Sequence, residues 1–526
     1  MIRTWNQRKT MVLFFLILLF RAFFSWKVPL IDDEAYHWSW THNIMLSYYD
    51  HPGMIAWLET LSLGIFGPTY WGVRFPSFVC FGLTVFVSYR LAKDLFGEVA
   101  SLVTGVMLLF SPLWGFGGYV ASPETPFMLC FVLSVWIFWQ GIRPDHSRWS
   151  TAKTWIWLGL TMGLGLNSKF IIALLAPGFG LHLLLSQEHR KILLTRWPWL
   201  GALLATVIST PIFLWNLQYD WPGFRYQFYE RHTGAGGLSW SRWLEWFTAQ
   251  NIFFTPVVFA LMLWAFGKSF TAILKSNGCR FPASWRYLFC MTAPTLLIFY
   301  PQPLWAEFKP HWAGGAHLLL VMGAGALWDE GFVFRNRVWM LPRSRKILIT
   351  ALGFLIPLNL FIYTPFLGPW MPKVYRQLTQ LFASVGETPQ PWNIRWDLSN
   401  EFYGWEDLGK ELHRVSREFH AEVGQKPFLA ALRYETTAQT WWGTKQKVYS
   451  LSTTKSHYTV IQKAHHELDA LIGQNALVVT PEKYPANPME WAQFDRCEPR
   501  EFRTYRGREL ARIFTIWKCF NYQALK

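Results

Sequence analysis

The segment TMVLFFLILLFRAFFSWKVPLIDDEAYHWSW, residues 10–40, joins a long apolar run to three consecutive acidic residues. The apolar part, residues 10–29, is as long as a helix that crosses a bilayer, which needs roughly 17–25 residues. Asp32, Asp33 and Glu34 follow it, and no small-residue cleavage site of a removable signal peptide lies between. We therefore predict a membrane-spanning helix that leaves the bilayer into an acidic loop.

Ten further apolar runs follow this first one. Together the eleven runs lie at about residues 10–29, 71–91, 98–114, 126–142, 154–168, 170–187, 197–215, 249–267, 286–302, 311–329 and 347–369. The chain is 52% hydrophobic and 16% charged, whereas a soluble domain is about a quarter charged. This composition excludes a disordered chain, a collagen-like fibre and a small disulfide-stabilised protein. We predict a polytopic α-helical membrane protein with about 11 transmembrane helices.

Charged residues divide the chain into two predicted domains. They make up 12% of residues 1–370 and 24% of residues 371–526. Within the second domain, the helical pattern of residues 404–422 is followed by strand-like segments that include 427–432 and 511–520. Such alternation is typical of a small α/β domain. We predict a transmembrane module followed by a soluble domain. This domain either stabilises the protein or covers the loops as a lid, or else it recognises the acceptor.

Basic residues predict how the spans are oriented in the membrane. The short loops on one side carry 20 Lys and Arg, and those on the opposite side carry 5. Because cytoplasmic loops hold the excess of positive charge, we predict a cytoplasmic N-terminus. An odd number of spans then places residues 371–526 outside the cytoplasm. Ten of the 16 acidic residues before residue 371 also fall outside, so we expect the functional site on the outer face.

The net charge of +16 does not indicate a nucleic-acid-binding protein, because the sequence shows no basic face and no binding motif. A nucleotide-binding fold is not indicated either, since no G-x-G-x-x-G or P-loop motif is present. The six cysteines include no C-x-x-C pair, which argues against a zinc ribbon. Cys497 and Cys519 both fall in the predicted external domain, where oxidation can occur. Spacing alone does not establish whether they pair.

The first external loop, residues 31–61, contains five carboxylates and three histidines but no Lys or Arg. Its Trp and Tyr residues fit an aromatic belt at the membrane interface, which is the alternative interpretation of the loop. The carboxylates do not fit that interpretation. A carboxylate held at a membrane boundary is partly desolvated and becomes a stronger base. We predict a catalytic role for Asp33 or Glu34 in taking a proton from a hydroxyl.

Other predicted external segments place single charged residues at span ends. Glu124 lies between two prolines, and Lys169 lies at the end of a span. Arg225 and His232 are interleaved with aromatic residues, and the segment AEFKPHW, residues 306–312, adds an acid, a lysine and a histidine. The alternative is that Lys169 snorkels and that the other cations contact lipid headgroups. Together, carboxylates and cations on one face fit a lipid substrate that carries a phosphate.

Short motifs occur along the chain in a recognisable order: DEAYHWSW, LSYYDHPGMIAWL, VRFPS, SPETP, GLNSKF and STPIFLWNLQYDWPGFRYQ, and later FLAALRYETTAQTWW, KVYSL and ALVVT. This order resembles bacterial members of glycosyltransferase family 39, relatives of the dolichyl-phosphate-mannose–protein mannosyltransferases and of the aminoarabinose transferase of lipid A. The resemblance covers the membrane part and continues into the external domain. It implies a GT-C fold in the bacterial cytoplasmic (inner) membrane, with a lipid-linked sugar donor and inverting transfer in the outer leaflet.

The resemblance also implies roles for residues of the first loop, which we extend to residues 30–70. Asp33 matches the acidic residue of the family's Asp-Glu motif, the expected general base on the acceptor hydroxyl. The stretch Asp50-His51-Pro52-Gly53 matches the acidic–basic–Pro–Pro element near the donor phosphate, with Gly53 in place of the second proline. His51 is thereby a candidate for binding the donor phosphate.

Later segments carry the remaining candidates. Glu124 stands where relatives commonly have Asp, and we expect it to keep the catalytic role of that carboxylate. Lys169, Arg225 and His232 fall in segments that resemble the family's, and we predict that they bind the donor phosphate. Some relatives hold a divalent metal near the acidic–basic element, for which Asp50 and His232 are the candidate ligands. Two ligands do not specify a metal site, and no other cofactor is implied.

We predict an enzyme that transfers a monosaccharide, with inversion, from a polyprenyl phosphate to an envelope acceptor on the outer face of the membrane. The acceptor is lipid A, another glycan or a protein hydroxyl. The alternative function is a transporter or flippase of lipid-linked sugars, which should show inverted repeats or ionisable residues at mid-membrane. Apart from Arg21, the sequence shows neither. A non-catalytic envelope assembly protein is the third interpretation.

Overall fold

The computed structural model describes residues 7–118, 120–143, 149–230, 237–274, 283–330, 332–334, 337–339, 353–355, 357–358, 361, 363–383 and 391–526. The chain divides into two compact units, each made from separate stretches of sequence. Unit 1 consists of Met1–Ser25, His51–Leu58 and Arg74–Asn359, and unit 2 consists of Trp26–Asp50, Glu59–Val73 and Leu360–Lys526.

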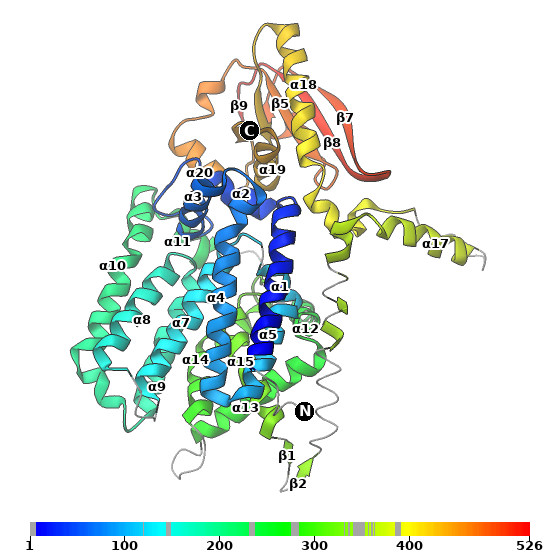
Figure 1. The fold of residues 1–526 in the computed structure, drawn as a ribbon. Helices are drawn as coiled ribbons and strands as arrows, with labels where there is room; N and C mark the ends of the chain where they lie inside the picture. Colours follow the sequence, from blue (N-terminus) through cyan, green and yellow to red (C-terminus); the bar gives the residue numbers. More distant parts are fainter. Residues whose placement is uncertain are drawn as a thin grey trace. The chain divides into compact units, whose positions relative to one another are not determined.

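Unit 1 is built mainly from helices (Figure 1). Their bounds are α1 Gln7–Lys27, α4 Tyr70–Phe96, α5 Glu98–Phe110, α6 Pro112–Gly117, α7 Glu124–Ile142, α8 Thr151–Leu166, α9 Leu175–Leu185, α10 Arg196–Gln218, α11 Pro222–Phe228, α12 Trp240–Phe254, α13 Pro256–Leu274, α14 Ala283–Phe299 and α15 Gly314–Glu330, followed by the hairpin of β1 Phe332–Phe334 and β2 Arg337–Trp339. Helix α8 packs against α7 and α10, and α15 packs against α5, α13 and α14.

Two glycines allow α8 and α10 to approach closely. A Cβ atom on Gly159 would lie 2.4 Å from the carbonyl oxygen of Gly201, and one on Gly201 would lie 2.6 Å from the carbonyl oxygen of Trp155. Small residues at helix contacts are typical of helices that pack against each other in a bilayer, where close packing replaces the hydrophobic effect.

Four of the described helices are long and apolar enough to cross a membrane: α4, α7, α10 and α13. A fifth span results if Val12–Lys27 and Asp32–Trp40 are counted as one bent span. Shorter apolar helices lie at Met54–Phe66, Glu98–Phe110, Phe170–Leu185 and Gly314–Trp328. The predicted span 347–369 lies partly outside the described residues.

Two predicted spans are interrupted in the structure. Residues 98–114 are broken at Ser111, which has an extended backbone between the end of α5 at Phe110 and the start of α6 at Pro112. Residues 249–267 were expected to form a single helix, but α12 ends at Phe254 and α13 begins at Pro256. Between them Thr255 has a φ of 66°, a left-handed conformation that no helix continues through. The residue before a proline is also disfavoured in the helical region, so the Thr255–Pro256 pair explains the break.

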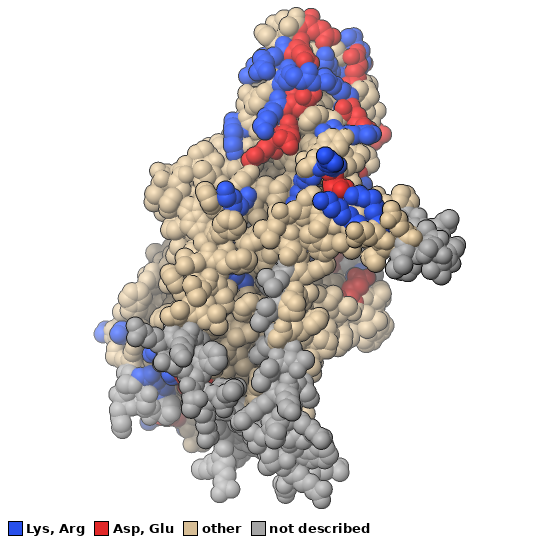
Figure 2. Space-filling view, turned by 45° about the vertical axis from the view of Figure 1, so that its right-hand side comes forward, with Lys and Arg blue, Asp and Glu red and all other residues tan. Residues whose placement is uncertain are grey.

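Unit 2 contains a five-stranded sheet in the order β4-β3-β5-β8-β7. Its strands are β3 Phe428–Ala431, β4 Val448–Ser450, β5 Ala476–Pro481, β7 Arg496–Arg506 and β8 Glu509–Phe520. Strand β3 pairs in parallel with β4 and β5, while β8 runs antiparallel to β5 and β7. The short strands β6 Ala492–Gln493 and β9 Ala524–Leu525 pair separately. On the face shown in Figure 2, charged side chains gather in one region and are sparse over much of the remaining surface that is drawn in colour.

Helix α18, Trp405–Val423, covers one face of this sheet. Leu408, Leu412, Val415 and Phe419 recur at the spacing of one helical face and are fully buried. They pack in one cluster with side chains from β3, β5 and β8, namely Leu429, Leu477, Val479, Phe514 and Ile516. Because side chains alternate along a strand, the neighbouring positions Phe428, Ala430, Ala476, Val478 and Cys519 build a second cluster.

Cys497 and Cys519 form a disulfide. They occupy paired positions on the neighbouring strands β7 and β8. The pairing that the sequence left open is therefore settled by the register of these two strands.

The remaining helices of unit 2 are α2 Asp32–Trp40, α17 Met371–Ala383, α19 Tyr434–Thr444 and α20 His457–Ala464, together with most of α3 Met54–Phe66. Helix α2 packs against α19. The Nε2 of Gln439 in α19 donates to the carbonyl oxygen of Leu30 at 2.8 Å, and the Trp38 and Trp442 rings meet with centroids 4.8 Å apart. The segment that follows the first apolar run is thus held by residues near the end of the chain.

Candidate active site

The first turn of α2 presents its three acids in different ways. The backbone N–H of Ile31 donates to Oε2 of Glu34 at 3.0 Å, and the Glu34 side chain is fully buried. Asp33 is exposed, and its own backbone N–H donates to Oδ1 of Asp32 at 3.0 Å. Acidic residues are favourable at the N-terminal end of a helix because their negative charge is attracted by the positive end of the helix dipole. Of the two predicted catalytic acids, Asp33 is the one that a substrate in solvent can reach.

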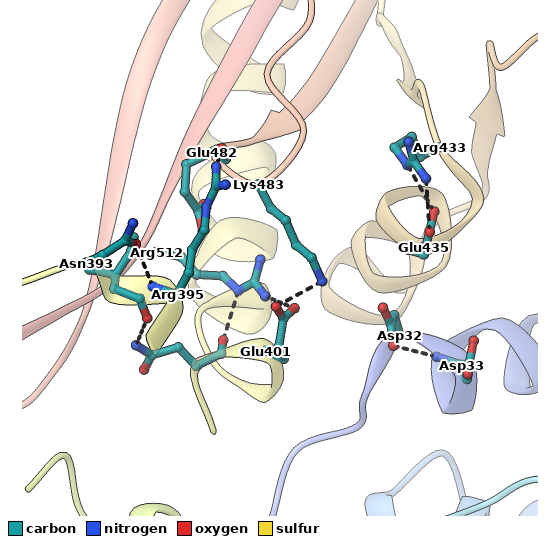
Figure 3. A network of polar contacts seen from close by, with 12 residues as sticks. Asp32, Asp33, Asn393, Arg395, Glu401, Arg433, Glu435, Glu482, Lys483 and Arg512 are labelled. Carbon is teal, nitrogen blue, oxygen red and sulfur yellow. Dashed lines mark hydrogen bonds and ion pairs between the residues drawn. The ribbon is translucent and has the colours of Figure 1, made fainter. Parts of the chain in front are cut away.

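Asp32 belongs to a network of charged side chains from the C-terminal part of unit 2 (Figure 3). At its centre, Glu401 lies 3.0 Å from the Nζ of Lys483 and 2.6 Å from a guanidinium nitrogen of Arg512. Burial raises the pKa of Asp32, and the charges of Glu401 and Glu435 raise it further, against the Asp33 N–H and the Lys483 ammonium. Asp32 is therefore surrounded by charged side chains, and its carboxylate accepts the Asp33 N–H at the start of α2.

Tyr434, the first residue of α19, lies among four carboxylates. Its pKa is raised by burial and then by the charges of Asp33, Glu435, Asp32 and Asp50. Asp50 also accepts a hydrogen bond from the hydroxyl of Tyr36. Two acids that the sequence placed in one loop, 17 positions apart, thus lie around a single tyrosine that comes from the other end of the chain.

A second cluster lies within unit 1 and is centred on Glu124, the first residue of α7. The Nζ of Lys169 forms an ion pair with Oε1 of Glu124, and the Nε2 of His311 lies 3.2 Å from the same oxygen. Lys169 is only 6% exposed. His51 lies close enough to interact with the Glu124 charge. Three predicted site residues, His51, Glu124 and Lys169, are therefore brought together.

Backbone contacts hold this second cluster in place. The Oγ of Ser168 donates to the carbonyl oxygen of Pro123 at 2.7 Å, which fixes the turn of Lys169 beside the start of α7. The N–H of Met54 donates to the carbonyl oxygen of Asn167 at 2.9 Å, which ties the segment of His51 to the same turn.

Gly53 has a local explanation as well. A Cβ on this residue would lie 2.6 Å from the Trp57 ring, so the space that a proline would need is already filled.

The other predicted residues are not part of these clusters. Arg225 forms an ion pair with Asp220 at 2.8 Å, and both side chains are exposed. His232 lies outside the described residues, and so the candidate metal pair with Asp50 is only half described. Among the residues that the structure describes, no group of three or more His, Cys, Asp or Glu side chains could hold a metal ion.

Two residues of these clusters, Tyr36 and Tyr434, were missed as site residues by sequence reasoning, and His311 was noted without an assigned role. Tyr36 lies one helical turn after Asp33, a spacing that places both on one face of α2 and could have drawn attention to it. His311 and Tyr434 lie within segments noted above, but nothing in their sequence neighbourhood links them to Glu124 or to Asp33. Their placement depends on contacts between distant parts of the chain.

The part of the chain that holds the second cluster is similar to a known protein family. Residues 50–215 match the family model of dolichyl-phosphate-mannose-protein mannosyltransferase. The predicted family resemblance is confirmed. The matched residues hold His51, Glu124 and Lys169, and with them most of the second cluster.

Two curated relatives illustrate the similarity. Lipid A galacturonosyltransferase RgtD of Rhizobium johnstonii is 25% identical over 316 residues, which cover 57% of this chain and 63% of the relative. Undecaprenyl phosphate-alpha-4-amino-4-deoxy-L-arabinose arabinosyl transferase 1 of Pseudomonas fluorescens is 27% identical over 233 residues, which cover 43% of this chain and 40% of the relative. The matched stretches thus span less than two thirds of either relative.

Among solved structures, the crystal structure of ArnT from Cupriavidus metallidurans bound to undecaprenyl phosphate is similar over 97% of this chain and 98% of its own. The TM-score is 0.62 and the sequence identity is 15%. The same protein in the apo state gives a TM-score of 0.60. This likeness shows that the chain has the GT-C membrane fold.

Proposed function

We propose that the chain is a membrane glycosyltransferase, which transfers a monosaccharide with inversion from a polyprenyl phosphate to an envelope acceptor. Support comes from its likeness to a lipid A galacturonosyltransferase and to an arabinosyl transferase that is named for undecaprenyl phosphate. The similar ArnT structure holds undecaprenyl phosphate itself. The observation that carries the proposal is the exposed Asp33 carboxylate at the start of α2, which lies close enough to Tyr434 to interact with it.

In the proposed mechanism, Asp33 takes the proton of the acceptor hydroxyl as that oxygen attacks the anomeric carbon. The attack comes from the face opposite the phosphate, so the configuration inverts. The bond to the phosphate breaks, and the polyprenyl phosphate leaves with its negative charge. His51 and Lys169 stabilise that charge, as cations do for a leaving phosphate. Glu124 holds Lys169, and Arg225 and His232 are further candidates for phosphate binding.

The proposed setting is the outer face of the bacterial cytoplasmic membrane, with about 11 spans, a cytoplasmic N-terminus and residues 371–526 outside. The excess of basic residues in alternate loops supports this orientation. The disulfide between Cys497 and Cys519 supports it too, because disulfides persist in oxidising compartments outside the cytoplasm. We assign residues 1–370 to the membrane module and residues 371–526 to the external α/β domain. A lipid A or other glycan acceptor fits the named relatives.

Asp33→Asn tests the proposal. We expect inserted protein of normal stability that makes roughly 100-fold less product, since an amide cannot act as the base. Transfer is measured with purified protein, an undecaprenyl phosphate sugar and lipid A, with mass spectrometry of the product. Asp32→Asn is the matched control, because an Asn at this position still accepts the Asp33 N–H, and it should keep most of the activity. Near-normal product from Asp33→Asn would remove this residue as the base.

A further inference from the structure

Tyr36 is fixed both by packing of its ring and by two hydrogen bonds of its hydroxyl. Its ring is buried among three aromatic side chains, with centroid distances of 4.8 Å to Tyr434, 5.1 Å to Trp40 and 5.2 Å to Tyr458. Its hydroxyl donates to Oδ2 of Asp50 and accepts from the backbone N–H of His457 at 2.7 Å. With the ring fixed and both contacts made, the hydroxyl has one orientation.

His457 is the first residue of α20, and Ser456 caps this helix. The first N–H groups of a helix have no partner within it and carry partial positive charge. One of them therefore points at the Tyr36 oxygen, which makes the phenol a stronger donor to the Asp50 carboxylate. Burial, together with the Asp50 charge, raises the pKa of Tyr36 well above its ordinary value, so that the hydroxyl stays protonated and keeps donating.

The simpler explanation is that this contact only attaches α2 to the C-terminal part of unit 2. Two other hydrogen bonds already do so. The Tyr458 hydroxyl donates to Oγ of Ser39 at 2.7 Å, and Gln439 donates to the carbonyl oxygen of Leu30 at 2.8 Å. In neither bond is Asp50 a partner. The Tyr36 hydroxyl differs from them because its hydrogen goes to a carboxylate of the acidic–basic element.

We propose that Tyr36 is a positioning residue, which holds the Asp50 carboxylate in place and, through His457, lets the C-terminal part of unit 2 set that position. The inference rests on the proposed function, in which His51, the residue after Asp50, stabilises the donor phosphate. A carboxylate held by a hydroxyl has its charge partly compensated and its direction fixed. Without the Tyr36 hydroxyl, the carboxylate loses this donor, and its less compensated charge repels an incoming phosphate more strongly.

Binding of undecaprenyl phosphate to the purified full-length chain tests this inference without requiring transfer. Tyr36→Phe keeps the buried ring and removes the hydroxyl, and we expect binding to weaken roughly 10-fold, as for the loss of a hydrogen bond to a charged group. Tyr458→Phe is the matched control, because it removes an equally buried hydroxyl from the same aromatic cluster. We expect it to change the Kd by less than about twofold.

A double-mutant cycle separates positioning from general loosening of the fold. If Tyr36 acts through Asp50, then Tyr36→Phe has no further effect in an Asp50→Asn background, since a neutral amide does not repel phosphate. Equal weakening by Tyr36→Phe and Tyr458→Phe, wild-type affinity of Tyr36→Phe, or additive effects in the cycle would each overturn the inference. A wild-type chain that binds undecaprenyl phosphate but transfers no sugar would refute the proposed function alone. One that does not bind it would refute both.

Discussion

The Nζ of Lys169 forms an ion pair with Oε1 of Glu124, although 45 positions of sequence separate the two residues. Their turns are joined by the bond from Ser168 to the carbonyl oxygen of Pro123. Because the lysine is almost fully buried, this pair differs from the many exposed ion pairs on the surface of unit 2. Removing one partner of such a pair leaves a charge in a poorly solvated place.

Lys169→Met should therefore lower both stability and donor binding. We expect a loss of about 1–2 kcal/mol in stability, because Glu124 keeps its charge without the ammonium, although it is one-third exposed and still contacts His311. The double variant Lys169→Met with Glu124→Gln should recover much of the stability but none of the donor binding. Thermal unfolding and undecaprenyl phosphate binding of the purified variants measure the two effects. A double variant as unstable as the single one would contradict the assignment of the stability loss to Glu124.

His311 should contribute to activity through its bond to Glu124. We expect His311→Ala to lower kcat/KM roughly 10-fold, the usual scale for a lost hydrogen bond to a charged group. His311→Gln should retain more activity, because its amide can still donate to the carboxylate. Lys309→Ala, an exposed change in the same segment, is the control. If Lys309→Ala and His311→Ala lower the rate equally, the effect belongs to the segment and not to the imidazole.

Glu59 should make unit 2 less stable as the pH rises. Its side chain is 0% exposed, and neither carboxylate oxygen has a hydrogen-bond partner among the described residues. Burial, with the Glu34 charge, raises the pKa of Glu59 well above its ordinary value of 4.5. The folded chain then holds a proton that the unfolded chain has lost. The stabilisation is complete below the unfolded pKa and disappears as the pH rises through the folded one.

Glu59→Gln should remove this dependence. We expect an apparent melting temperature about 2 °C higher than that of the wild type near pH 8, and no difference near pH 4. Thermal unfolding across this pH range provides the comparison. If Glu59→Gln had a lower melting temperature than the wild type at high pH, then the Glu59 carboxylate would be ionised in the folded chain and stabilised by a positive charge or a hydrogen-bond donor, which would contradict the prediction.

The disulfide should stabilise the edge of the sheet. Replacing both Cys497 and Cys519 by Ser removes a link across 22 positions, which should cost roughly 2–4 kcal/mol. Hydrogen exchange measured by mass spectrometry should show faster exchange in β7 and β8 and unchanged exchange in α8. Cys80→Ser, at one of the free cysteines, is the control and should leave all of these segments unchanged. Unchanged exchange in β7 would show that the hydrogen bonds to β8 are sufficient.

Local patterns in the sequence were sufficient for some of these features. The apolar runs, the acidic start of α2 and the order of the motifs all lie within short stretches, and they predicted the GT-C membrane fold and made Asp33 a candidate base. The break at Thr255 was missed because hydropathy averages across it, although the Thr-Pro pair was a visible signal. The ion pair of Lys169 and the place of Tyr434 could not be found in this way, since distant pairings decide them. The same holds for the cysteines, whose pairing depends on strand register.

Unit 2 is assembled from stretches that lie far apart in the sequence, and this affects how it folds during translation. Helix α2 is synthesised long before α19 and α20, which contact Trp38 and bind Tyr36. Until α19 and α20 have been synthesised, Trp38 and its neighbours lack their native contacts, and the first loop cannot reach its native conformation. A polypeptide that stops before residue 434 would leave these rings accessible to chaperones and proteases, so only chains extended past His457 can bury them and bind Tyr36.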